Sequence, residues 1–152
     1  MAEAAYADDK VKQADSLFAE GQALLQKGRV PEACAKMEES YALDAAQGTL
    51  LNMAFCHEKQ GRVGLAFREY RRAAARAEQE GDASRLKFAA SRATELEAKL
   101  VRLEWEPDQR PLIISVSIDG DPLLGEVDRV FVEPGKHVLD VTSKPPGTIE
   151  WE

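Results

Sequence analysis

The sequence predicts an α+β fold, in which an N-terminal α-α repeat of two hairpins and a capping helix precedes a small antiparallel β-sandwich-like domain. Ala, Leu, Glu, Lys, Gln and Arg dominate the first hundred residues, as in helical proteins. Within this part, a pattern of small and apolar residues repeats after 33 positions. Beyond Glu104 the apolar spacing falls to near two, which is typical of strands. We therefore expect a helical domain over residues 1–100 and a β-domain over residues 101–152.

Helix-breaking residues divide the first domain into segments of helical length. The breakers are Gly28, Pro31, Gly48, Gly61 and Gly81. They predict helices at about 8–27, 31–43, 48–59, 63–80 and 83–100. Asp82 is a suitable N-cap for the last of these. That helix carries one apolar stripe, from Leu86 to Leu100, which is the pattern of a helix covering the exposed end of a repeat.

The repeat is carried by small residues and helix-ending glycines. Gly21, Gly28, Ala33, Met37 and Ser40 recur as Ala54, Gly61, Ala66, Tyr70 and Ala73. Small residues allow the two helices of a hairpin to approach closely, and glycine tolerates the positive φ at a helix end. Over about residues 14–77 this pattern resembles the tetratricopeptide repeat. The resemblance implies a protein-binding groove lined by the first helix of each hairpin.

The register of that resemblance predicts which side chains line the groove. They are Phe18, Gln22 and Leu25 from one helix and Leu51, Asn52, Phe55 and Lys59 from the other. An apolar strip edged with amides suits a partner's helix or extended segment. Asn52 could serve in capturing a C-terminal carboxylate, but Phe18 and Gln22 stand where such repeats carry Lys and Asn. An alternative is that the fifth helix or the β-domain fills the groove within the same chain.

The β-domain combines short β-branched runs with two turn signals. Asp119-Gly120 and Pro134-Gly135 favour tight turns. The run from Ser117 to Val141, with a strand–Pro-Gly–x-His–strand hairpin at its centre, resembles the PEGA-type module. That family is a small β-sandwich of bacterial envelope proteins, often fused to tetratricopeptide repeats. The two resemblances together imply a periplasmic or cell-envelope protein. A cytoplasmic location is the alternative, because the N-terminus does not resemble a signal peptide.

The only two cysteines, Cys34 and Cys56, fall on helices that the repeat places side by side. One reading is a disulfide that staples the two hairpins, which an oxidising compartment would permit. The other is a pair of free thiols buried in the core, where cysteine is often found. The sequence leaves both open.

Charge and motif spacing argue against several classes of function. The net charge is −7, and residues 106–152 alone carry 10 acidic and 4 basic side chains, so we do not expect nucleic acid as a partner. No apolar run is long enough for a transmembrane segment. His57 and His137 lack metal-ligand spacing, and no nucleophile or phosphate-binding motif is present. We therefore expect no enzyme, no metal and no cofactor.

A row of arginines on the fourth helix has two readings. Arginine recurs every four residues, at Arg68, Arg72 and Arg76. These side chains form either a solvated face or a contact for an anion.

The function that fits these features is a protein–protein interaction scaffold in a bacterial envelope assembly. The β-domain would then position or anchor it. One alternative is a carbohydrate- or peptidoglycan-binding protein that stacks a cell-wall glycan on Trp105 or Trp151. Another is a regulatory fragment of a larger envelope enzyme.

Overall fold

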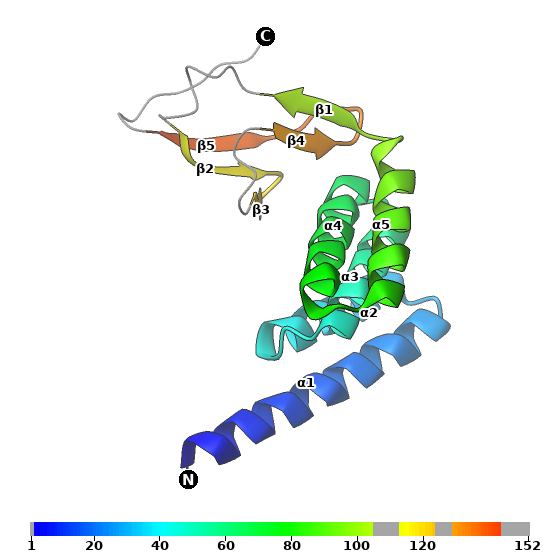
Figure 1. Ribbon diagram of the computed structural model, residues 1–152, viewed down its shortest axis with the longest axis vertical. Coiled ribbons are helices and arrows are strands. Elements are labelled where there is room, and N and C mark those ends of the chain that lie inside the picture. The colour runs from blue at the N-terminus through cyan, green and yellow to red at the C-terminus, as the bar shows by residue number, and fades with distance from the viewer. Residues whose placement is uncertain (1, 105–112, 124–128, 144–152) are drawn as a thin grey trace. The chain divides into compact units, whose positions relative to one another are not determined.

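A computed structural model describes residues 2–104, 113–123 and 129–143 of the chain (Figure 1). The chain forms two compact units, Met1–Ala98 and Lys99–Glu152, here called the helical unit and the β unit. The helical unit consists of α1 (Ala2–Gln26), α2 (Val30–Leu43), α3 (Gln47–Lys59), α4 (Val63–Glu80) and α5 (Ala83–Glu97). In the described part of the chain, no helix combines the length and the apolar character needed to cross a bilayer.

The first helix of each hairpin ends in the same hydrogen-bonded turn. The Arg29 N–H donates to the Leu24 carbonyl at 3.0 Å, and Gly28, with φ of 72°, occupies the left-handed position between them. The Arg62 N–H donates to the His57 carbonyl at 3.0 Å, across Gly61 with φ of 80°. This is the Schellman geometry, which requires a residue without a Cβ at the turn. The repeat seen in the sequence is therefore a repeat of backbone structure.

Small residues allow the helices to pack closely, and each helix packs against the next along the chain. Ala33, Ala54, Ala66 and Ala73 are fully buried, as the repeat pattern predicts. Gly21 faces Met37 so closely that an added Cβ would lie 3.0 Å from the Met37 Cε atom. The larger core residues of the helical unit, Met37, Leu50, Phe67, Tyr70 and Leu96, are buried around these small ones.

One polar contact recurs in both hairpins with its direction reversed. In the first hairpin, the Ser40 hydroxyl on α2 donates to the Ala14 carbonyl on α1 at 2.8 Å. In the second hairpin, the Gln47 amide on α3 donates to the Ala73 carbonyl on α4 at 3.1 Å. Gln47 lies 33 residues after Ala14, and Ala73 lies 33 residues after Ser40. The two hairpins thus keep the contact while exchanging donor and acceptor.

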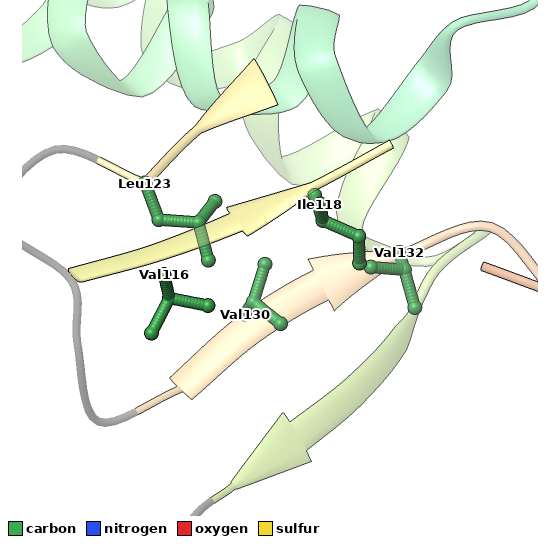
Figure 2. Packing of buried hydrophobic residues seen from close by; sticks show 5 residues of the cluster. All are labelled: Val116, Ile118, Leu123, Val130 and Val132. Atoms are coloured by element: carbon green, nitrogen blue, oxygen red, sulfur yellow. The ribbon is translucent and has the colours of Figure 1, made fainter. Parts of the chain in front are cut away.

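The β unit contains two antiparallel sheets. The strands are β1 (Val101–Glu104), β2 (Ile113–Ile118), β3 (Asp121–Pro122), β4 (Arg129–Val132) and β5 (Leu139–Ser143). Among the described strands, β1 pairs with β4, and the other sheet has the order β3-β2-β5. The core lies between β2 and β4, where Figure 2 shows the side chains of Val116, Ile118, Leu123, Val130 and Val132. The unit is therefore sandwich-like, as expected.

The prediction of a hairpin around Pro134-Gly135 is wrong. β4 pairs with β1 and β5 pairs with β2, so residues 133–138 cross from one sheet to the other. The Asp119 turn captures the start of β5, because the Val138 N–H donates to the Asp119 Oδ1 atom at 2.9 Å. The Asp119 N–H in turn donates to the Val138 carbonyl at 2.8 Å. These bonds favour pairing of β5 with β2.

Candidate functional site

The residues predicted to line a groove lie on α1 and α3 and differ in exposure. Phe18, Leu25, Leu51 and Asn52 are half-buried, whereas Gln22, Phe55 and Lys59 are exposed. We call these seven residues the first-helix surface. Leu25 packs against the cluster that contains Ala33, Cys34 and Cys56.

Phe55 is the most prominent apolar side chain of the first-helix surface. It is 39% exposed. The Lys59 Nζ atom lies 5.2 Å from the centroid of its ring, so a cation already covers one face. The Asn52 amide is engaged within α3, where it donates to the Gly48 carbonyl at 2.9 Å. The surface therefore offers apolar and cationic contacts rather than a pair of free amides.

One residue of this kind was not predicted from the sequence. Val11 on α1 is 43% exposed and lies seven residues, or about two turns, before Phe18. The same spacing separates Phe18 from Leu25. Val11 precedes the region that matches the repeat, which is why the register did not include it. The spacing of seven along α1 is the signal that could have found it.

A disulfide fixes α3 to the first hairpin directly behind Phe55. Cys34 on α2 and Cys56 on α3 are bonded, with their Cα atoms 5.5 Å apart, and both are buried. This settles the choice that the sequence left open. Leu24, Leu25 and Val30 pack around the bridge. The α3 backbone that carries the exposed Phe55 is therefore covalently linked to α2.

The neighbouring His57 connects three helices through two carboxylates. Its Nδ1 atom lies 2.8 Å from Glu69 on α4, and its Nε2 atom lies 2.8 Å from Glu38 on α2. His57 is 1% exposed and Glu69 is 6% exposed, so this pair is buried. Burial lowers the pKa of His57, but the hydrogen bond to Glu69, the charge of Glu69 and the hydrogen bond to Glu38 outweigh it and raise the pKa above its usual value.

We expect the helical unit to lose stability as the pH rises above 6.5, the pKa of His57 in the unfolded chain. Because the pKa of His57 is higher in the folded chain, its contribution is complete below the unfolded value of 6.5 and is lost as the pH passes the folded value. Above that point, the imidazole can donate to only one of its two carboxylates. Urea unfolding followed by far-UV circular dichroism at a series of pH values measures this.

The matched control for the pH series is His57→Leu/Glu69→Gln, which lacks the titrating ring and the buried carboxylate. Its free energy of unfolding should change much less over the same pH series. An equal decline in both proteins would assign the pH dependence to other groups.

The predicted row of arginines has partners within the helical unit. The Arg72 guanidinium lies 5.3 Å from the Tyr41 ring centroid, which ties α4 to α2. Arg76 donates to the Ala45 carbonyl and pairs with Glu80 at 2.7 Å. Arg68 is half-buried. These contacts give Arg72 and Arg76 a structural role, and an anion contact at the row stays a prediction.

Two other predicted features can be placed only in part. Trp105 and Trp151, on which a glycan site was predicted, lie outside the described residues. His137 lies in the β unit, where its Nδ1 atom is 2.7 Å from Asp119. Within the described ranges, no three His, Cys, Asp or Glu side chains are grouped to hold a metal ion.

A comparison of this chain with models of known protein families and with curated proteins found no match.

Proposed function

We propose that this chain is a non-enzymatic scaffold that binds a protein partner through the first-helix surface of the helical unit. The observation that carries the proposal is the exposed Phe55, which stands directly beside the buried Cys34–Cys56 bridge and the His57 cluster. Binding energy in protein interfaces is concentrated in a few aromatic anchors on well-ordered backbone. Phe55 has both properties, since it is exposed while its neighbours on α3 are fixed to α2 and α4.

The chemistry of the surface indicates the kind of partner. Phe55, Phe18 and Leu25 provide apolar area, and Lys59 provides a cation at its edge. An amphipathic helix or extended segment with apolar side chains and a nearby carboxylate would match it. The resemblance of the helical unit to tetratricopeptide repeats supports this mode of binding.

The disulfide supports an oxidising location for this scaffold. Structural disulfides persist in the periplasm and on cell surfaces and are rare in the cytosol. A location in the bacterial envelope is therefore proposed, in agreement with the PEGA-type resemblance of the β unit. In that setting the β unit would position or anchor the helical unit.

We expect a Phe18→Ala/Phe55→Ala bait to retain about tenfold less of its main partner than the wild-type bait. The reason is that truncating aromatic anchors removes the contacts that contribute most to affinity. Affinity capture from bacterial envelope extract, quantified by mass spectrometry, measures the difference. Val138→Ala is the matched control, because Val138 is 63% exposed but lies in the β unit.

Circular dichroism establishes that both variants remain folded. Equal recovery of the same proteins by the wild-type and double-variant baits would show that the first-helix surface is not the binding site.

A further inference from the structure

The β unit has an apolar face that is covered over one strand and open over the next. In the β1–β4 pair, Val101 is opposite Val132 and Leu103 is opposite Val130. Residues directly opposite each other in an antiparallel pair point to the same face of the sheet. Val130 and Val132 are 1% and 4% exposed, whereas Val101 and Leu103 are 45% and 40% exposed. The sheet that covers β4 therefore leaves the same face of β1 open.

This open face is one side of a hollow of about 430 Å³. Leu103 lines it from β1, Ile118 and Leu139 line it from the opposite sheet, and Val132 lines it from β4. A volume of this size is in the range of sites that take up several apolar groups. The hollow continues the hydrophobic core, since Ile118 and Val132 belong to both (Figure 2).

The wall formed by residues 133–138 is held in place by one histidine. The His137 Nε2 atom donates to the Glu133 carbonyl at 2.7 Å, and its Nδ1 atom lies 2.7 Å from the Asp119 carboxylate. The bond to Asp119 and then the bond to Glu133 raise the pKa of His137. The hollow is therefore preformed, which reduces the ordering cost of binding.

The charges around the hollow select for a cationic partner. Glu104 and Glu133 belong to its lining, with the Arg102 Nε atom 3.4 Å from Glu104, and the basic residue of its described lining, His137, faces the Asp119 carboxylate. Residues 99–152 carry 11 acidic and 6 basic side chains, a net charge of −5 with His neutral. Such a field attracts basic segments and repels acidic ones.

We propose that this hollow is a second binding site, which takes an extended protein segment with an apolar side chain flanked by lysine or arginine. The apolar side chain fills the space beside Leu103, and the cations lie against Glu104 and Glu133. Among the described strands β1 pairs with β4, and the proposed segment lies along the other edge of β1. The site uses no residue of the first-helix surface and does not depend on that proposal.

The probe is a short acetylated peptide with alternating lysine and valine, labelled with fluorescein, and the readout is fluorescence anisotropy with the full chain. We expect saturable binding that weakens with added salt. Leu103→Asp should weaken binding about tenfold, because it places a charge in the apolar hollow. Glu104→Gln should weaken it about threefold, because it removes one rim charge at an exposed position. Phe55→Ala should leave it unchanged.

Two control peptides separate the contribution of the cations from that of the apolar side chains. One has glutamate in place of lysine and the other has serine in place of valine, and neither should bind. The proposal is overturned if the glutamate peptide binds equally well, or if both Leu103→Asp and Glu104→Gln bind like the wild type. Near-UV and far-UV circular dichroism show whether Leu103→Asp folds, and Glu104→Gln serves as the test if it does not. Concentration-dependent dimers that the probe cannot compete with would identify a second copy as the occupant instead.

Discussion

Reduction of the Cys34–Cys56 disulfide is expected to lower the melting temperature of the helical unit by about 15 °C. The bridge closes a loop with a sequence separation of 22. In the chain-entropy account, a loop of this length stabilises the folded state by about 3 kcal/mol. A change of 1 kcal/mol shifts the melting temperature of a domain of 60–100 residues by about 4–8 °C. Thermal unfolding at 222 nm, with and without a reductant, measures the shift in the helices.

The control is the double variant Cys34→Ala/Cys56→Ala. It should melt near the temperature of the reduced wild-type protein and should not respond to the reductant. A wild-type shift below about one degree would mean that the bridge does not stabilise the fold.

Replacement of His57 by leucine is expected to lower the free energy of unfolding by about 3–5 kcal/mol, which is the cost of leaving a buried charge without its partner. The Glu69 side chain is 7% exposed and lies 2.8 Å from the His57 Nδ1 atom. Leucine is the informative substitution because Leu24 occupies the corresponding place in the first hairpin, 33 residues earlier. The stability is therefore lost because the Glu69 charge is no longer compensated, and not because leucine fails to fit at position 57. Urea unfolding near pH 6 measures it.

The double variant His57→Leu/Glu69→Gln tests this explanation. Removing the carboxylate together with its partner should recover more than half of the lost stability, since an uncharged amide is less costly to bury. If the single and double variants are equally unstable, the loss comes from packing around position 57 and the charge explanation is wrong.

The helices and their repeat could be predicted because each signal is local. Gly28, Gly61 and Gly81 end α1, α3 and α4 through their own φ angles, which nothing distant has to supply. The start of α1 was predicted at residue 8 but lies at Ala2. The six residues before Asp8 contain four alanines and no breaker, so helix propensity extends the helix toward the N-terminus.

The polar cluster at His57 could not be predicted, because its partners are distant in the sequence. Glu38 lies 19 residues before His57, and Glu69 lies 12 residues after it. Neither separation matches a spacing within a single helix, so no local pattern marks them. Only the packing of α2, α3 and α4 brings the three side chains together.

The strand pairing of the β unit shows the same limit. Pro134-Gly135 correctly indicated a change of direction, but a turn signal does not specify which strands pair beyond it. The pairing depends on the burial of Val130 and Val132 between the sheets and on the capture of Val138 by Asp119. Both are contacts between segments that are separated along the sequence.

The bridge between the two hairpins also determines how the chain would respond to mechanical load. Pulling the chain from its two ends would load this bridge. Force applied there passes through the sulfur–sulfur bond between Cys34 and Cys56 and bypasses the residues enclosed by it. At 3.3–3.6 Å per extended residue, the loop between the two cysteines corresponds to about 70 Å of chain that cannot be extended while the bridge is intact. The turn between the hairpins, together with Phe55, would stay inside this closed loop even after the surrounding helices had been pulled open.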